Sequence, residues 1–454
     1  MVLDGVFERF SDKRPIPVMA RVILERVLKP KKLDEWFEQT TQRQYTRELL
    51  FSSVVNIMSL VAFKASRSVH SAYRTLGEDI GVSVTSVYNK INCVETTTSR
   101  ALVRDTAAEF AQMLEELKGT RSPWLPGYRV KVLDGNCIEA TEHRLKVLRD
   151  TPAGPLPGKS LVVYDPSLEM AIDVFPCEDG HAQERSLLGE VIPTVQANDL
   201  WIMDRNFCVR ELLAGINAQR GHFICRQHQG LPFTAKGDER FVGRLENGTV
   251  YEQWIEIAST GEGKARRYRR IRVELKRPTR NGDKELYILT SLSKSAAKAK
   301  QVAEMYRRRW KIETMFQELE AHLNSEVNAL GYPRAALFAF CIALVAYNAL
   351  AVIKGALRRI HGEQRVADEL SGYYLAGELT SCYEGMMVAL SAADWHRIRE
   401  TSKSEYIALL LRIASAANLE RYRKTKRGPK KPRPKRNKYA DKPHVSTARL
   451  LRER

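Results

Sequence analysis

Residues 199–204 read DLWIMD, four apolar side chains between two aspartates, and this stretch decides the fold. A short continuous apolar run is typical of a strand in the middle of a buried sheet. A second stretch, YRVKVLD (128–134), alternates apolar and polar residues and also ends in an aspartate. We expect both Asp134 and Asp204 to close a strand and open a turn, in LDGN and MDRN. An aspartate before Gly or Asn is also an ordinary turn residue. Two of them on neighbouring strands favour a site, because ligands and catalytic groups gather at strand ends.

The residues around these strands predict a mixed α/β region. SLVVYD (160–165) and MAIDVF (170–175) are expected to be the next two strands of a meander, and HFICR (222–226) a further strand. ERSLLGEVI (184–192) and CVRELLAGINAQ (208–219) have the apolar spacing of helices.

The segments on either side differ in character. Residues 1 to about 120 carry apolar side chains at helical spacing, and the stretch 68–94 predicts two helices joined at Gly81. That pair is either a DNA-binding helix-turn-helix or a plain helical hairpin, and the pattern fits both equally. Residues 229–288 contain strand-like runs separated by Gly-rich turns, which predicts an all-β segment.

Two helices are expected after the β segment. The first, 293–323, is long and begins at a serine cap. The second includes AALFAFCIALVAYNALAVI (335–353), which has no charged residue. It reaches the length of a membrane span, but it is rich in alanine, contains Asn348 and stands alone in the chain. We therefore expect a buried core helix rather than a membrane helix.

The charge of the chain points to a polyanionic partner. With 73 Lys and Arg against 54 Asp and Glu, the formal net charge is +19, which favours nucleic acid first and an anionic membrane second. Residues 421–454 hold fifteen Lys and Arg against two acids and are rich in proline, so this arm is expected to be disordered. The seven cysteines form no CxxC pair, which indicates a reducing cytosol and neither disulfides nor structural zinc.

A third carboxylate lies in the first predicted helix, within YRRRWKIETMFQ (306–317). At about 100° per residue, Tyr306, Arg309, Glu313 and Glu320 fall near one line of the helix, beside an apolar stripe. An ordinary solvated face with ion pairs accounts for such charges equally well. Three converging carboxylates would suit Mg²⁺ or Mn²⁺, hard ions that prefer oxygen ligands, and two such ions serve phosphoryl transfer.

Taken in order, these residues resemble the DDE transposases of bacterial insertion sequences, in the group called the IS-four family. That family has a Tyr, two residues, Arg, three residues, Glu, six residues, Lys motif, and Tyr306, Arg309 and Glu313 match it. Asp134-Gly135 matches the DG turn of the first family aspartate, and Asp204-Arg205-Asn206-Phe207 matches the turn of the second. The β-rich stretch matches the insertion that these enzymes carry before the glutamate. The resemblance covers roughly residues 125–350.

The resemblance implies an RNase-H-like α/β core in which Asp134, Asp204 and Glu313 are the catalytic carboxylates and hold two Mg²⁺ or Mn²⁺ ions. It implies a cytoplasmic, nucleoid-associated bacterial enzyme that cuts the terminal inverted repeats of its element and joins the 3′-hydroxyl to target DNA, as a homodimer on paired ends. The expected DNA-binding residues are Tyr306, Arg309, Arg205, Trp254, Trp310, Lys430, Lys431, Arg433, Lys435 and Arg436.

Six regions are expected on this basis. They are a helical DNA-binding domain (1–122), the first part of the core (123–228), the β insertion (229–290), the second part of the core with the glutamate helix (291–360), a helical region (361–420) and the basic arm (421–454).

The sequence departs from the motif at one position, because Glu320 stands where the family has lysine. This reverses a charge that the resemblance expects to contact DNA. Two other functions fit the same residues: an RNase-H-like nuclease that never joins strands, and a non-catalytic DNA-binding regulator derived from a transposase. A nuclease would cut DNA without joining strands, whereas a transposase would do both. A non-catalytic regulator would keep its cellular effect after substitution of Asp204, whereas a transposase would lose it.

Overall fold

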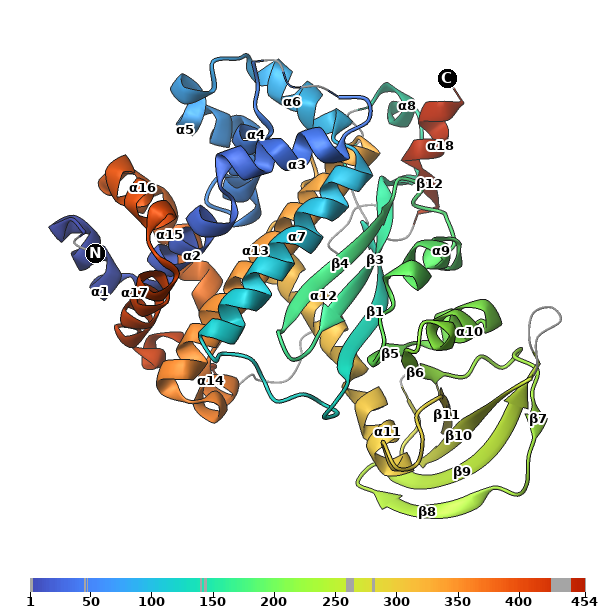
Figure 1. Cartoon of the computed structure of the whole chain (residues 1–454). Helices are drawn as coiled ribbons and strands as arrows, with labels where there is room; N and C mark the ends of the chain where they lie inside the picture. The colour runs from blue at the N-terminus through green and yellow to red at the C-terminus, as the bar shows by residue number, and fades with distance from the viewer. Residues whose placement is uncertain are drawn as a thin grey trace.

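The computed structural model describes residues 3–44, 46, 48–138, 141–142, 145–258, 265–279, 282–425 and 442–453 of the 454-residue chain. Its centre is a ten-stranded mixed sheet with helices on both faces (Figure 1). Further helices from both ends of the chain pack together beside this sheet.

Five strands form one half of the sheet, in the order β4–β3–β1–β5–β6. β1 is parallel to β5 and β5 to β6, whereas β3 is antiparallel to both β1 and β4. This order and these directions are those of an RNase-H-like core, so the predicted fold class is confirmed. The strands are β1 (Arg129–Ile138), β3 (Gly158–Asp165), β4 (Met170–Cys177), β5 (Asp199–Met203) and β6 (His222–Arg226).

The predicted β insertion continues the same sheet instead of forming a separate one. β11 pairs with β6, and β10 lies between β11 and β9, all antiparallel. β7 and β8 both pair with β9. The strands are β7 (Thr234–Ala235), β8 (Arg240–Leu245), β9 (Gly248–Ile257), β10 (Arg266–Leu275) and β11 (Glu285–Thr290).

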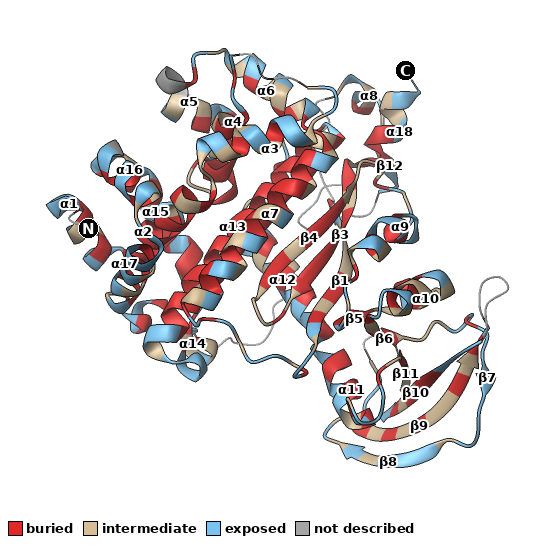
Figure 2. Ribbon diagram, viewed as in Figure 1, coloured by how far each residue is buried: buried red, intermediate tan, exposed pale blue. Residues whose placement is uncertain are grey.

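Alternation along the strands divides the apolar side chains between two cores. Val130 and Val132 of β1 belong to a core shared with α7 (Thr96–Glu116) and α13 (Pro333–His361). Leu133 belongs to a second core, shared with α9 (Leu188–Val191) and α10 (Arg210–Ala218). Successive strand residues point to opposite faces, so the core half of the sheet is buried on both sides, whereas β7 and β8 at the outer edge of the insertion are largely exposed (Figure 2). The side chain of Asp134 therefore points to the α13 side and position 135 to the α9 side.

The apolar helix α13 is a core helix, as expected. In the described part of the chain it is the one helix long and apolar enough to cross a membrane, and that apolar window is fully buried. Its single polar side chain in the middle, Asn348, is fully buried too. Asn348 accepts a hydrogen bond from the backbone N–H of Ala171 at 2.9 Å and donates to the Ala171 carbonyl at 2.8 Å. These bonds tie α13 to β4.

The N-terminal part is helical, as predicted, and consists of α1 (Gly5–Lys13), α2 (Pro15–Val27), α3 (Pro30–Thr40), α4 (Phe51–Ala62), α5 (Val69–Ile80), α6 (Val84–Cys93) and α7. Gly81 ends α5 with a φ of 68°, a left-handed conformation that favours glycine. Ser83 then caps α6 by accepting a hydrogen bond from the N–H of Ser86. Two helices joined by a turn at Gly81 are confirmed, and their identity as a DNA-binding helix-turn-helix stays a prediction.

Four helices follow α13. α15 (Gly372–Ala389), α16 (Ala392–Glu400) and α17 (Lys403–Ser415) pack against α2, whereas α14 (Glu363–Glu369) packs against α13. The end of the chain returns to the core. β12 (His444–Ser446) pairs with β2 (Gly154–Leu156), and α18 (Thr447–Arg452) contacts α8 (Lys146–Arg149).

The prediction of a disordered arm is therefore wrong for residues 444–452. The reason is a polar contact that composition does not reveal. The Asp179 carboxylate accepts hydrogen bonds from Ser446 Oγ at 2.6 Å and from Arg449 Nε at 2.8 Å. The five predicted DNA-binding residues of the arm lie outside the described residues: Lys430, Lys431, Arg433, Lys435 and Arg436.

Candidate active site

Asp134 and Asp204 lie at the same level of the sheet. In the parallel pairing of β1 with β5, Leu133 lies opposite Met203, and each aspartate is the next residue. Asp204 follows the end of β5 and caps a 3₁₀ turn, where its Oδ1 accepts a hydrogen bond from the Asn206 N–H at 2.7 Å. The expectation of a strand end followed by a turn is confirmed for Asp204.

The same expectation is wrong for Asp134. β1 continues to Ile138, because β3 offers it backbone partners as far as Gly158 opposite Ile138. Asp134 and Gly135 are therefore extended residues inside a strand. Asp134 still reaches the edge of the site, since its parallel neighbour β5 stops one residue earlier.

The helix that carries Glu313 differs from the single long helix predicted for 293–323. α11 (Ala299–Arg307) is followed by a 3₁₀ turn at Arg308–Trp310 and then by α12 (Lys311–His322). α11 begins after Lys298, whose backbone N–H donates to Gln301 Oε1 at 2.8 Å, rather than at a serine cap. The turn changes the phase of the helix, so a uniform 100° per residue does not describe Tyr306, Arg309 and Glu313 together.

Arg309 nevertheless brings the predicted residues together. Its Nη1 donates to Asp134 Oδ2 at 2.7 Å, and its Nη2 donates to Glu313 Oε1 at 2.8 Å. The residue is 8% exposed, and its Nε has no hydrogen-bond partner. Burial opposes its charge, but Asp134, Tyr306 and Glu313 together raise the pKa of Arg309. A single cation thus links a strand carboxylate to a helix carboxylate 179 positions later in the chain.

Crowding of negative charge alters the acidity of the first aspartate. Burial raises the pKa of Asp134 to about 7; Arg309 opposes this shift, and the neighbouring Asp204 and Glu313 add to it. Desolvation and nearby like charge both disfavour the ionised form of a carboxyl. A nearby cation therefore stabilises the ionised form of this carboxyl group strongly, because it offsets the electrostatic cost of ionisation.

Tyr306 lies beside the same group and is 7% exposed. Burial raises its pKa to about 12, with Arg309 opposing this and the charge of Asp204 contributing. Trp310 is different, because 59% of its surface is exposed next to this cluster. The structure therefore brings Tyr306 and Arg309 to the carboxylates and leaves Trp310 open to solvent.

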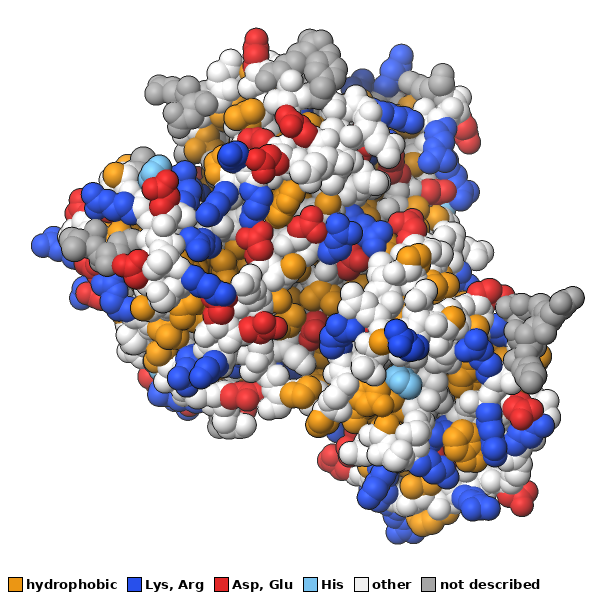
Figure 3. Space-filling model, viewed as in Figure 1, with side chains coloured by type: hydrophobic (Ala, Val, Ile, Leu, Met, Phe, Trp, Pro, Cys, Tyr) orange, Lys and Arg blue, Asp and Glu red, His pale blue; other side chains and the backbone are white. Residues whose placement is uncertain are grey.

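The other predicted DNA-binding residues lie on the β insertion side. Arg205 lines a pocket of about 880 Å³ between the ends of β5 and β6 and the β10–β11 hairpin, with Arg226, Lys276 and Lys284. Trp254 of β9 is half-buried, with the guanidinium of Arg267 4.8 Å from its ring centroid. Lys and Arg side chains recur over the visible surface of the insertion (Figure 3).

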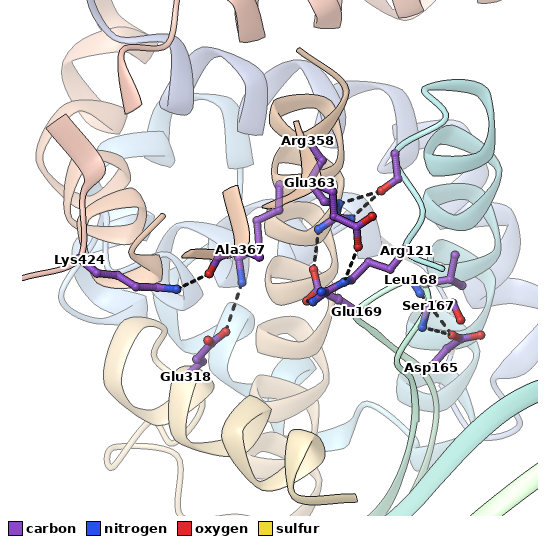
Figure 4. A network of polar contacts seen from close by, with 12 residues as sticks. Arg121, Asp165, Ser167, Leu168, Glu169, Glu318, Arg358, Glu363, Ala367 and Lys424 are labelled. Atoms are coloured by element: carbon purple, nitrogen blue, oxygen red, sulfur yellow. Dashed lines mark hydrogen bonds and ion pairs between the residues drawn. The ribbon is translucent and has the colours of Figure 1, made fainter. Parts of the chain in front are cut away.

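The back of α12 is fixed by a second polar network. Glu318 of α12 pairs with Lys354 of α13 at 3.4 Å, and Glu169 accepts from both Arg121 and Arg358 (Figure 4). These pairs border a pocket of about 920 Å³ beside α12, which Glu320 also lines. The Glu318–Lys354 pair joins α12 to α13, and the buried side chains of Ile312, Met315 and Leu319 seat α12 on the core.

The donor set suits a hard divalent ion. Among the residues that the structure describes, no three His, Cys, Asp or Glu side chains are gathered closely enough to ligate one ion. The reason is Arg309, whose guanidinium occupies the space between Asp134 and Glu313 and balances their charge. Oxygen ligands from Asp134, Asp204 and Glu313 match the preference of Mg²⁺ and Mn²⁺, so the residues fit once Arg309 is displaced.

Sequence patterns did not reveal two residues of this region. The side-chain amide of Asn206 donates to Glu184 Oε2 at 3.3 Å, and the carboxylate of Glu184 also lies against Gly135 of β1. The one signal that pointed here was the glycine that follows Asp134, which we expected to serve a turn.

Comparison with known proteins gives one family match and one similar solved structure. Residues 126–349 match the family model described as transposase DDE domain. No curated protein matches. Among solved structures, the chain is similar to a piggyBac transposase synaptic complex with hairpin DNA, at 12% sequence identity and a TM-score of 0.41, over 89% of this chain and 86% of that chain. The resemblance to DDE transposases is confirmed for the domain, and the narrower assignment to the IS-four family stays a prediction.

Proposed function

We propose that this chain, whose residues 126–349 are a transposase DDE domain, is a DNA transposase that cuts the ends of an insertion sequence and joins the freed 3′-hydroxyl to target DNA. The bridge made by Arg309 supports this most directly. It draws Asp134 and Glu313 together beside Asp204, inside the segment that matches the family.

The three carboxylates would hold two Mg²⁺ or Mn²⁺ ions. When bound, such ions supply Lewis acidity to a scissile phosphate and activate the attacking oxygen. The rest of the chemistry belongs to the chain. Asp134, Asp204 and Glu313 would define the site at one sheet edge, where the side chain of Asp134 is 17% exposed.

Arg309 and Tyr306 would then bind phosphates of the DNA. Once the carboxylates are compensated by cations, the Arg309 guanidinium is free to pair with a phosphate, for which its two-pronged donor geometry is suited. Tyr306 keeps its proton at neutral pH, because burial raises its pKa to about 12. Its hydroxyl can therefore donate to a phosphate oxygen throughout the physiological range.

The pocket next to Asp204, lined by four cations and by the carboxylates Glu274, Asp283 and Glu285, would receive the DNA strand. Arg205, Arg226, Lys276 and Lys284 line it between the end of β5 and the β insertion. Contacts of this kind position the phosphate backbone without reading sequence. We expect the helix pair α5–α6, with the exposed start of α6, to bind further along the same duplex.

A cutting and joining assay tests the proposal. The full chain is incubated with Mg²⁺ or Mn²⁺, a supercoiled target and labelled DNA taken from both sides of its own coding sequence. Wild type should give cut ends and joined products, and Asp134→Ala should give neither while still binding DNA. Cut but never joined DNA would identify a nuclease instead, and equal products from both proteins would refute the assignment.

A further inference from the structure

One short segment, the 3₁₀ turn Glu184–Leu187, contacts the chain just after each of the two aspartates. Its first residue meets β1 at Gly135, the residue that follows Asp134. A Cβ atom at position 135 would overlap Glu184 Oε1, and the carboxyl carbon of Glu184 lies 2.6 Å from where that Cβ would be. Gly135 is extended within β1, so no turn requires glycine there. Its missing side chain allows the carboxylate to lie against the strand.

The same carboxylate contacts the turn that follows Asp204. Asn206 Nδ2 donates to Glu184 Oε2 at 3.3 Å, and Arg185 Nε donates to the Asn206 carbonyl at 2.8 Å. Asn206 is therefore bound through both its side chain and its backbone by two successive residues of one turn.

The 3₁₀ turn Glu184–Leu187 lies on one face of the sheet and the carboxylates of the candidate site on the other. The turn leads into α9, and Leu187 is buried with Phe207 in the core on that face. Position 135 points to the α9 face, whereas Asp134 points to the α13 face. Glu184 thus lies behind the site and contacts it through neighbouring residues.

Asn206 connects Glu184 to the candidate site. Its backbone N–H donates to Asp204 Oδ1 at 2.7 Å. An aspartate that accepts such a bond from the residue two positions later has its side chain oriented by the turn. The orientation of the Asp204 carboxylate therefore depends on where Asn206 is held.

From these contacts we infer that Glu184 is a positioning residue, which holds Asn206 in place and so orients the Asp204 carboxylate relative to Asp134, with Gly135 leaving the space that Glu184 occupies. The inference rests on the proposed function of the site. Hydrogen-bond partners that orient the ligands of a metal ion contribute to metal affinity and activity without touching the ion. In this role Glu184 acts as a hydrogen-bond acceptor, and its charge is not required.

Binding of Mn²⁺ to the DNA-free full-length protein, measured by titration calorimetry, tests the inference apart from activity. Glu184→Ala should weaken Mn²⁺ binding by about tenfold or more, the loss typical when a group that orients a metal ligand is removed. Glu184→Gln should bind nearly as wild type does, because its amide oxygen can accept the same hydrogen bond. Glu190→Ala is the matched control, since Glu190 lies in the adjacent α9 and is exposed.

Two further variants test the contacts on either side of Glu184. Asn206→Ala removes the amide and keeps the backbone N–H, and Gly135→Ala would push the flexible end of Glu184 away. Each should weaken Mn²⁺ binding as Glu184→Ala does, and adding either to Glu184→Ala should weaken it little further, since all three remove one contact. Unfolding temperatures in EDTA should stay close to wild type, because none of these three residues is fully buried.

Cleavage gives a second measurement. Glu184→Ala should lower the rate at saturating DNA and leave the dissociation constant for DNA unchanged, because Asp204 is oriented less well and the DNA contacts remain. A loss confined to DNA binding would overturn the positioning role. Equal weakening of Mn²⁺ binding by Glu184→Gln and Glu184→Ala would also overturn it, since the charge of Glu184 would then be what matters.

The outcomes also separate this inference from the proposed function. If Asp134→Asn and Asp204→Asn abolish Mn²⁺ binding while Glu184→Ala binds as Glu190→Ala does, Glu184 does not position the site and the three-carboxylate site stands. If the two aspartate variants bind Mn²⁺ as wild type does, or wild type binds none, both proposals fail.

Discussion

At the scale of single residues, Arg309 links two carboxylates that belong to distant segments of the chain. Its two donors hold Asp134 of β1 and Glu313 of α12 within hydrogen-bond distance of one side chain. The sequence motif predicted Arg309 as a phosphate ligand. Its contacts add a second role, which is to balance the carboxylates when no other cation does.

Removing that charge should make the protein more dependent on divalent ions. In EDTA, Arg309→Met should lower the free energy of unfolding by about 3 kcal/mol, the cost of leaving buried carboxylates without a partner. Adding Mg²⁺ should then stabilise Arg309→Met more than wild type, because Arg309 no longer competes for the carboxylates. Urea unfolding with and without Mg²⁺ measures both. Arg308→Met, which changes an exposed neighbour, is the control. If Mg²⁺ raised the free energy of unfolding equally in all three proteins, Arg309 would not balance the charge of the carboxylates.

The raised pKa of Asp134 predicts a particular dependence of stability on pH. Its pKa is about 7 when folded and about 3.8 when unfolded, so between these values the folded state binds the extra proton. Stability should therefore fall as pH rises from about 4 to about 7, by at most about 1.4 kcal/mol per pH unit, and then level off.

Asp134→Asn should remove that slope. The free energy of unfolding is measured in EDTA at pH 4.5, 6 and 8. Relative to wild type, the variant should become more stable as the pH rises to about 7, with no further change above it. A difference between the two proteins that is the same at every pH would show that Asp134 has an ordinary pKa.

At the scale of elements, most of the strands could be predicted and the connections between distant segments could not. DLWIMD and YRVKVLD carry their own burial pattern, so β5 followed from a continuous apolar run and β1 from local alternation. The end of β1 did not, because β3 sets it through pairing that continues past Asp134. The 3₁₀ turn at Arg308–Trp310 was missed for a similar reason, since helical periodicity carries no signal for one tighter turn.

For the candidate site too, residues in local motifs could be predicted and a contact between distant segments could not. Asp204 and Glu313 were predicted from motifs whose residues are close in sequence, and the structure places both beside Asp134. Glu184 was missed, because its contact with Gly135 joins residues 49 positions apart on different elements. Asp134-Gly135 held that information, but the dipeptide is also common in turns.

The C-terminal strand and helix should detach when Asp179 loses its charge. Burial opposes the shift, but hydrogen bonds from Ser446 and Arg449 lower the pKa of Asp179 to about 2. A carboxylate with a depressed pKa stabilises the folded state above about pH 4, and that contribution is lost as pH falls through about 2. Hydrogen exchange at residues 444–452 should therefore be faster in Asp179→Asn at pH 7. Asp150→Asn, which changes an exposed residue next to α8, should show wild-type exchange at residues 444–452. Slow exchange there in both variants would show that the hydrogen bonds to Asp179 are not needed to hold this segment.

At the scale of the whole molecule, the insertion places a pocket that contains four cations next to the candidate carboxylate site. The insertion extends the core sheet beyond β6, so the pocket with Arg205 and Lys276 opens directly beside Asp204. The α5–α6 pair lies away from that pocket on the far side of α13 (Figure 1). A duplex bound by both would run across the molecule.

The basic arm should contribute affinity without specificity. Replacing Lys430, Lys431, Arg433, Lys435 and Arg436 by Gln should lower the salt dependence of DNA binding. The magnitude of the slope of log K against log salt should fall by about 4.5 if all five contact phosphates, since each phosphate contact contributes about 0.9. The variant should discriminate between its own DNA and random DNA as wild type does. Fluorescence anisotropy at several salt concentrations measures this, and an unchanged slope would show that the arm does not contact DNA.

The most direct measurement of the central claim is the rate of DNA strand cleavage in Mg²⁺ at saturating DNA. The claim is that Asp134, Asp204 and Glu313 form one ion-dependent phosphoryl-transfer centre. Asp134→Asn, Asp204→Asn and Glu313→Gln should each cut at least about 10³-fold more slowly than wild type while binding the same DNA. Glu304→Gln, which replaces an exposed carboxylate of α11, should cut at the wild-type rate. Cleavage at the wild-type rate by any of the three site variants would contradict the account.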